Sequence, residues 1–223
     1  MESLYININV SDALYLKNPE SSALGKSIVT NSIILINELG FEAFTFKKLG
    51  EKMTSPESSI YRYFENKHML LLYLTCWYWN WLEYKIVFAT ANIESAQVKL
   101  EKALNVITQR VTEDSNFTHV NEILLNEIVI SESIKTFYTK EVDDENEKGF
   151  FKIYIKLIDR MSAMVLDINP LYKFPHMLIS SVIEGVHQQR FFDKHFPVLI
   201  DDKKNEDVVS SFYNDLVFKT IHS

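Results

Sequence analysis

The segment that decides the fold is residues 40–71, GFEAFTFKKLGEKMTSPESSIYRYFENKHMLL. Thr45 is a favoured N-cap residue in front of apolar residues at helical spacing, which predicts a short helix over roughly 45–52. Asn66 occupies the same capping position before the long apolar segment that follows, so a long helix is expected to begin there and to run to about residue 90. A further helix is expected between the short helix and the long one.

That further helix begins after a turn at MTSP, residues 53–56. Thr54 and Glu57 have the spacing of a capping box, and Pro56 lies in the first turn of a helix that we expect to end near Phe64. Because a β-branched residue is costly at positive φ, Thr54 is expected to avoid that region. Glu57 has two interpretations: it caps the helix, or it accepts a hydrogen bond from a cytosine amino group.

Two short helices joined by a tight turn are typical of a helix-turn-helix. Phe46, Leu49 and Met53 have the spacing of an inward face on the first helix, and Ile60 and Phe64 have it on the second. The polar residues left on the outside of the second helix are Ser58, Ser59, Tyr61 and Arg62. Lys47, Lys48 and Lys67 flank them as candidate phosphate contacts. In such a motif one helix crosses the phosphate backbone and positions the next in the major groove.

The rest of the chain also has helical periodicity, so the predicted fold class is all-α. Asn18 and Pro19 predict the start of a first helix that ends at Gly40, with Ile28, Leu35 and Leu39 on one face and Val29, Ile33 and Ile36 beside it. Later helices are predicted near 94–112, 118–140, 146–167, 174–194 and 205–221. Breaks are predicted at Asn116, at Asp143–Asp144, at Asn169-Pro170 and at Pro197. Residues 4–10 alternate apolar and polar, as in a short strand or an ordered arm.

Residues 40–71 resemble the signature of TetR-family DNA-binding domains. That signature has a Gly, a Thr that opens a helix, a Tyr-x-Tyr-Phe and a Lys that opens the next helix. The residues at these places are Gly40, Thr45, Tyr61, Tyr63, Phe64 and Lys67. The resemblance covers roughly residues 24–72, about a fifth of the chain. Two positions depart from the family pattern, since this chain has Gly50 where an Ala is usual and Thr54 where a Gly is usual.

The resemblance implies roles for individual residues. Thr45, Tyr61 and Lys67 contact phosphates, while Tyr63 and Phe64 are structural. Lys47, Ser58, Ser59 and Arg62 lie near base edges or the backbone. The implied division is an arm over 1–17, a DNA-binding domain over 18–70 and a helical ligand-binding and dimerisation domain over 71–223.

The resemblance also implies a function. It is that of a cytoplasmic, homodimeric repressor that binds a pseudopalindromic operator in double-stranded DNA and responds to a small-molecule effector. The last two helices would form the dimer interface, with apolar contacts from Ile179, Val182, Ile183 and Val186 and with Ser180, Ser181 and Gly185 permitting close approach. An effector pocket lined by an aromatic series at helical spacing is one interpretation of Trp77, Trp81, Tyr84 and Phe88, and ordinary core packing is the other.

The net charge of −7 weighs against nucleic-acid binding, but the charge is uneven. Residues 45–67 contain five Lys or Arg and three Glu, so this segment is positive and the rest of the chain is acidic. The predicted DNA-binding part of the chain is called the head below. The acidic run 143–147 is expected to be a solvated loop. The alternative function is therefore a helical ligand-binding or interaction module that has lost DNA binding.

Other classes of protein receive little support. The one cysteine, Cys76, excludes an intramolecular disulfide and fits a reducing compartment, and residues 1–20 lack the pattern of a secretory signal. The apolar run 69–88 approaches membrane-spanning length, but Asn80, Glu83 and Lys85 interrupt it, so a buried helix is preferred. His119 with Glu122, and His187 with Glu184, have only two potential metal ligands each. No catalytic constellation, resident metal or cofactor is predicted.

Overall fold

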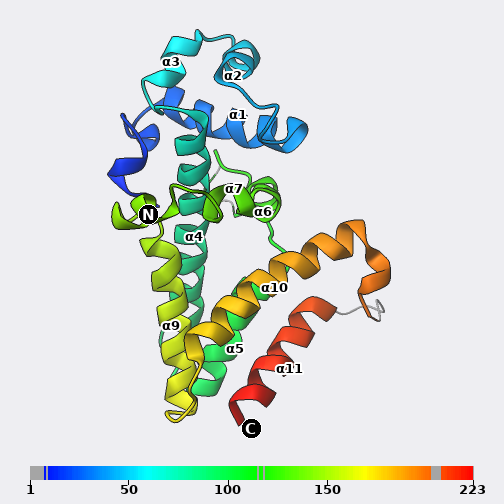
Figure 1. The fold of residues 1–223 in the computed structure, drawn as a ribbon. Coiled ribbons are helices and arrows are strands. Elements are labelled where there is room, and N and C mark those ends of the chain that lie inside the picture. Colours follow the sequence, from blue (N-terminus) through cyan, green and yellow to red (C-terminus); the bar gives the residue numbers. More distant parts are fainter. Residues whose placement is uncertain (1–7, 9, 115, 118, 202–206, 223) are drawn as a thin grey trace. The chain divides into compact units, whose positions relative to one another are not determined.

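The computed structural model describes residues 8, 10–114, 116–117, 119–201 and 207–222. All regular elements in these ranges are helical, which confirms the predicted all-α class (Figure 1). The α-helices are α1 (Ala23–Leu39), α2 (Phe46–Met53), α3 (Glu57–Tyr61), α4 (Lys67–Thr90), α5 (Ala96–Thr108), α6 (Glu122–Ser131), α7 (Ser133–Phe137), α8 (Val142–Glu147), α9 (Lys152–Ile168), α10 (Pro175–His195) and α11 (Val208–His222). Short 3-10 turns are η1 (Asp12–Leu14), η2 (Pro19–Ser21) and η3 (Pro197–Leu199).

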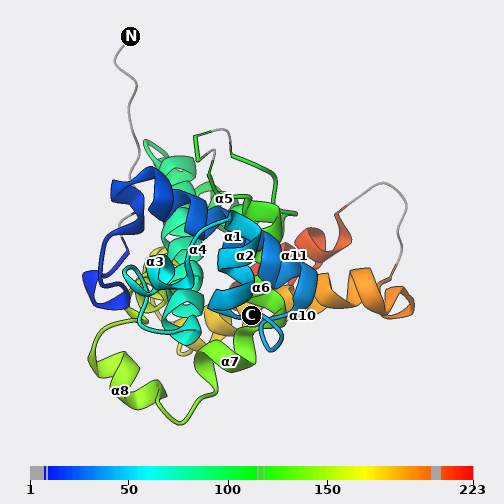
Figure 2. The same ribbon diagram turned by 90° about the horizontal axis from the view of Figure 1, so that it is seen from above.

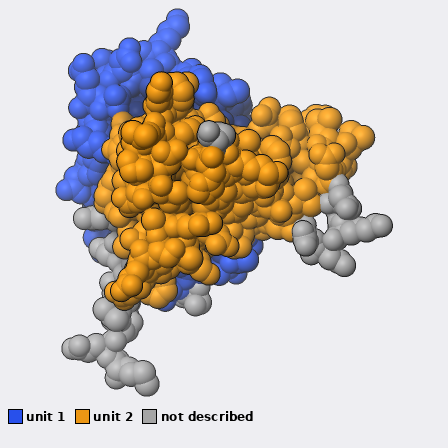
Figure 3. Space-filling model, turned by 90° about the horizontal axis from the view of Figure 1, so that it is seen from below, with its two compact units in different colours: residues 1–80, 111–152 blue, residues 81–110, 153–223 orange. Residues whose placement is uncertain are grey.

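The chain forms two compact units (Figure 3). Unit 1 comprises Met1–Asn80 with Val111–Lys152, and unit 2 comprises Trp81–Arg110 with Ile153–Ser223, so α4 contributes residues to both. In unit 1, α1 packs against η2, α2 and α6, and α2 packs against α3 (Figure 2). In unit 2, α11 packs against α5 and α10. The domain boundary predicted at residue 70 remains a prediction.

The first long helix begins later than predicted. The Asn18 side chain accepts a hydrogen bond from the Glu20 amide (2.9 Å) and caps only the 3-10 turn η2. Ser22 caps α1 by accepting from the amide of Gly25 (3.1 Å). A Cβ at Gly25 would collide with the carbonyl of Pro19, so glycine is what lets η2 fold back against α1.

The end of α1 is as predicted. Gly40 has φ 75° and donates its amide to the Ile36 carbonyl (2.8 Å). The predicted apolar face is buried except at Leu39, which is 42% exposed.

Two predictions for the middle of the chain are wrong. The helix predicted over 118–140 is divided into α6 and α7 at Glu132, whose side chain accepts from the Phe41 amide (3.2 Å) and pairs with Lys135 (2.7 Å). The acidic run predicted as a solvated loop forms α8. Within it Glu145 is buried and contacts His68 (Nε2 to Oε1 2.6 Å), so the charge is stabilised by a partner instead of by water alone. Most of the 4–10 segment lies outside the described residues.

The long helix α4 is buried on all sides over residues 70–79. Trp77, Trp79 and Trp81 are each at most 2% exposed, as the interpretation of a buried helix requires. No helix among the described residues has both the length and the apolar character needed to cross a membrane.

Candidate functional site

The helix-turn-helix is built on the caps that the sequence predicted. Thr45 accepts from the Lys48 amide (3.2 Å) at the start of α2, and Asn66 accepts from the Met69 amide (2.9 Å) at the start of α4. The inward face is also confirmed, because Phe46, Leu49 and Ile60 are buried together with Phe64. Met53 departs from it and is only half-buried.

The turn between α2 and α3 contradicts the prediction for Thr54. Its backbone is left-handed (φ 52°, ψ 42°), the conformation that sequence reasoning excluded for a β-branched residue. This conformation lets the amide of Ser55 reach the Gly50 carbonyl (2.9 Å) and so satisfies the end of α2. The capping box does not form either, since Pro56 is the N-cap of α3 and no side chain caps that helix.

The predicted DNA-binding side chains, apart from Lys67, lie on α2, on α3 or directly beside them. Those exposed are Thr45, Lys47, Lys48, Ser58, Tyr61 and Arg62, while Ser59 is half-buried. The ring of Tyr61 packs edge-on against Phe46 (centroids 5.0 Å apart, 71° between planes). That contact fixes the last residue of α3 relative to the start of α2. α3 ends at Tyr61, three residues before the predicted end.

The positive residues of the head are not equally available to a ligand. Lys48 donates to the Ala43 carbonyl (2.7 Å), and Lys52 pairs with Glu38 (3.0 Å). Lys47 and Arg62 make no hydrogen bond or ion pair with the described residues. These two are therefore the cations that a phosphate can engage without displacing a partner.

Lys67 is engaged inside the head. Its Nζ donates to the carbonyls of Phe41 (3.0 Å), Glu42 (3.1 Å) and Phe44 (3.3 Å), and it lies 4.7 Å from the centroid of the Phe41 ring. An ammonium has three donors, and here each has a carbonyl partner. Lys67 thus fixes the loop that leads into Thr45, a role that the sequence did not reveal.

Tyr63 has a similar internal role. It is 2% exposed, and its hydroxyl is 2.8 Å from the Oγ of Ser22, the cap of α1. The hydrogen bond with Ser22 lowers the pKa of Tyr63. Tyr63 therefore links the residues that follow α3 to the start of α1.

The aromatic series proposed as an effector pocket is divided between the two compact units. Trp77 lies in unit 1 and packs edge-on against Phe117 (5.4 Å), whereas Trp81, Tyr84 and Phe88 belong to unit 2. Phe88 is 75% exposed. None of the four lines either of the two cavities described below, so their role in binding an effector remains a prediction.

The four aliphatic residues proposed for the dimer interface are buried within their own chain. Ile179, Val182, Ile183 and Val186 are at most 3% exposed in unit 2. Gly185 faces Tyr213 of α11, where a Cβ would collide with the Tyr213 hydroxyl, so this small residue permits α10 and α11 of one chain to approach. The exposed apolar residues of these helices are others: Met177, Phe191, Phe212 and Leu216.

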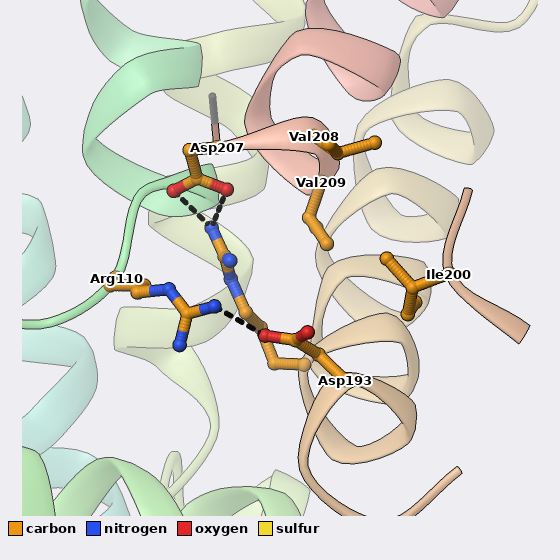
Figure 4. Close-up of a pocket in the computed structure, with 7 residues that line it drawn as sticks. Arg110, Asp193, Ile200, Asp207, Val208 and Val209 are labelled. Atoms are coloured by element: carbon orange, nitrogen blue, oxygen red, sulfur yellow. Dashed lines mark hydrogen bonds and ion pairs between the residues drawn. The ribbon is translucent and has the colours of Figure 1, made fainter. Parts of the chain in front are cut away.

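Unit 2 contains a cavity of about 280 Å³ where α10 meets the start of α11 (Figure 4). Arg190 donates to both carboxylate oxygens of Asp207 (2.7 and 2.6 Å) and to the carbonyl of Thr108, and Arg110 pairs with Asp193 (2.5 Å). Each arginine therefore has an aspartate partner. The pairs hold the end of α5, α10 and the start of α11 together, which indicates a structural role.

The two His–Glu spacings considered for metal binding do not form a site. His119 Nε2 contacts Glu20 (2.8 Å), and burial lowers the pKa of His187 to about 4. The described part of the chain holds no cluster of three or more His, Cys, Asp or Glu side chains that could bind a metal ion.

The described elements are all helical, and α2 and α3 form a helix-turn-helix in the first third of the chain. No family sequence model and no curated protein matches this chain. Among solved structures, a bacterial regulatory protein of the TetR family from Rhodococcus RHA1 superposes with a TM-score of 0.60 at 12% identity, covering 90% of this chain and 97% of that one. Apo AibR superposes with a TM-score of 0.50 at 13% identity, covering 86% of this chain and 96% of its own. The chain has the fold of TetR-family regulatory proteins, as the signature in residues 40–71 predicted.

Proposed function

We propose that this protein is a transcription regulator that binds double-stranded DNA through α2 and α3. One observation carries the proposal: the exposed outer face of a helix-turn-helix bears Lys47 and Arg62, which have no partner among the described residues, on the fold of a regulatory family. Hydroxyl groups of Ser58 and Tyr61 are exposed on the same element, where they can bond phosphates or base edges. We further propose that it acts as a repressor that a small-molecule effector releases from DNA. An effector that prefers a dimer whose two DNA-binding heads do not match the spacing of the DNA site must weaken DNA binding.

We propose that two copies associate through the outer faces of α10 and α11. Phe212 (54% exposed) and Leu216 (38%) lie four residues apart on α11, and Met177 (67%) and Phe191 (37%) are exposed on α10. An isologous pairing of such faces would present two reading heads to a pseudopalindromic site.

A second candidate is an interaction module that has lost DNA binding. The net charge of −7 and the presence of Glu57 at the start of α3 favour it. Among the described residues, Lys47 and Arg62 are the only Lys or Arg of positions 45–67 without a hydrogen bond or ion pair, which limits the number of phosphate contacts.

Fluorescence anisotropy with labelled DNA over a salt series separates the two functions. We expect tight, salt-sensitive binding to DNA from upstream of the protein's own gene and weaker binding to random sequence. No binding to either DNA at any salt concentration would support the interaction module.

Lys47 and Lys67 are expected to respond differently to truncation. Lys47→Ala should reduce the slope of log affinity against log salt by about 0.9, the value for one lost phosphate contact. Lys67→Ala should instead lower the free energy of unfolding, because three carbonyls lose their donor. Anisotropy and urea denaturation measure the two effects, with Lys52→Ala as the control for a lysine paired to Glu38. If Lys67→Ala reduced the salt slope of DNA affinity and left the free energy of unfolding unchanged, Lys67 would be a phosphate contact, as the sequence predicted.

Phe212→Glu is expected to convert a dimer into a monomer, since it places a charge in an apolar interface. Sedimentation velocity gives the mass in solution. Phe88→Glu is the matched control, because it makes the same change at another exposed phenylalanine, on α4 (75% exposed against 54% for Phe212). A dimer that survives Phe212→Glu, or a wild-type monomer, would contradict the proposed interface.

A further inference from the structure

Unit 1 contains a second cavity, of about 640 Å³, that no role described so far uses. It lies between α1, which contributes Thr30 and Ile34, and the segment that leads into α6. Its volume is within the range of pockets that bind small organic molecules. The cavity belongs to the same compact unit as the helix-turn-helix.

Three of the residues that line this cavity are acidic. They are Glu113, Asp114 and Glu122, and none of the described lining residues is Lys or Arg. His119 also lines it, but its Nε2 is already 2.8 Å from the Oε1 of Glu20. The Glu113 Oε1 accepts from the Asn121 amide nitrogen (2.7 Å), and neither Glu113 nor Glu122 forms an ion pair with a Lys or Arg among the described residues.

Glu122 is the member that points to a ligand. Its side chain is fully buried, and its Oε2 accepts a hydrogen bond from the Asp114 amide (3.2 Å). Its Oε1 is buried with no hydrogen-bond partner. Burial raises the pKa of Glu122 and outweighs the backbone hydrogen bond from Asp114, which lowers it. Such groups in native proteins are usually paired with a cation.

Other residues that line the cavity are apolar. They are Ile34, Val120, Leu124 and Phe117, and the ring of Phe117 is held edge-on against Trp77 (5.4 Å). An aromatic ring and aliphatic side chains in the same cavity as carboxylates are complementary to a molecule that has a positive group at one end and an apolar body.

We propose that this cavity binds an organic ammonium ion with an apolar body. The ammonium group lies at the carboxylates of Glu113 and Glu122, and the apolar body lies against Ile34 and Phe117. Because Oε1 of Glu122 is buried, contact with the ammonium group requires the lining around it to open. That such a cation acts as the effector rests on the proposed function: α1 lines the cavity and also packs against α2, so a bound cation acts directly on the element that supports the DNA-binding face.

The test uses the full-length protein without DNA, so its outcome does not depend on the proposed function. Hexylammonium chloride is titrated at constant ionic strength, and binding is followed by tryptophan fluorescence and by the shift in melting temperature. Hexan-1-ol and hexanoate are the neutral and anionic comparisons. We expect hexylammonium to bind at least tenfold more tightly than either. Glu122→Gln should weaken hexylammonium binding at least tenfold, and Glu101→Gln, an equal charge change on an exposed residue of α5, should not.

Three results would overturn the proposal. They are no saturable binding of hexylammonium, equal binding of hexan-1-ol, and equal affinities in wild type and Glu122→Gln. If Glu122→Gln does not fold, Glu113→Gln replaces it, because Glu113 is exposed and its removal leaves the core intact. Unchanged affinity in that variant overturns the proposal as well. Cation binding by a protein that binds no DNA would uphold the site and refute only the proposed function.

Discussion

Removal of the Arg160 side chain, as Arg160→Leu, is expected to lower the free energy of unfolding by about 3 kcal/mol, at the lower end of the range for breaking a buried ion pair. Glu83 of α4 is only 5% exposed. Its Oε1 accepts from Arg160 Nε (2.9 Å) and Nη2 (2.7 Å), while its Oε2 has no partner. Without Arg160, a buried carboxylate would keep only Lys156 (3.4 Å), whose side chain is 62% exposed and well solvated.

Urea denaturation followed by circular dichroism measures this effect, and a double-mutant cycle isolates its cause. Glu83→Leu combined with Arg160→Leu should recover most of the lost stability, because no unpaired charge then remains buried. Lys156→Ala should change stability by less than about 0.5 kcal/mol, as for most exposed charges. Equal destabilisation in the single and the double variant would show that Arg160 contributes packing and not charge.

The helix starts and the apolar faces of the head followed from the sequence because they depend on local chemistry. Thr45 and Asn66 cap helices with their own side chains, and Gly40 ends a helix because it adopts positive φ. Each of these needs only residues within four positions along the chain. Burial of Ile60 and Phe64 follows equally from their spacing.

The errors came from tertiary contacts that a single segment does not contain. Asn18 and Pro19 looked like the start of a long helix, but the close approach of η2 to Gly25 makes a separate turn there. Glu132 divides a helix because its carboxylate reaches the amide of Phe41, 91 residues away. Residues 143–147 have the composition of a solvated loop, but they form a helix in which Glu145 is buried against His68.

In the candidate sites, too, features that depend on local sequence were predictable and features that depend on tertiary contacts were not. Which side chains lie on the outside of α3 was predictable from helical spacing. That Lys67 uses its donors on three carbonyls was not, because those carbonyls belong to a loop 23 to 26 residues earlier. The acidic cavity combines α1 with described residues between Glu113 and Leu124, and the spacing of His119 and Glu122, which was not sufficient to predict a metal site, gave only an indirect signal of it.

Gly50→Ala and Thr54→Gly are expected to change stability in opposite directions. A Cβ at Gly50 would lie 2.7 Å from the Ser55 carbonyl oxygen and 3.3 Å from the Glu57 nitrogen, both backbone atoms that cannot rotate away. Gly50→Ala should therefore force α3 away from α2 and cost about 1–3 kcal/mol, the range for overpacked sites. Thr54→Gly removes a left-handed β-branched residue, a gain of about 1–2 kcal/mol that is reduced by the roughly 0.5–1 kcal/mol of extra chain entropy of glycine.

The double variant decides whether the two departures from the family pattern compensate each other. The left-handed backbone at Thr54 directs the chain so that the Ser55 carbonyl lies over Gly50, and a glycine at 54 lets that carbonyl move. Gly50→Ala should thus cost less in the Thr54→Gly background than in the wild type, by at least about 0.5 kcal/mol, the size at which coupling exceeds additivity. Urea denaturation of all four proteins measures the coupling, and DNA anisotropy reports whether α3 returns to its position. Strict additivity would mean that Gly50 is required by the packing of α3 alone and that Thr54 has no part in creating the clash.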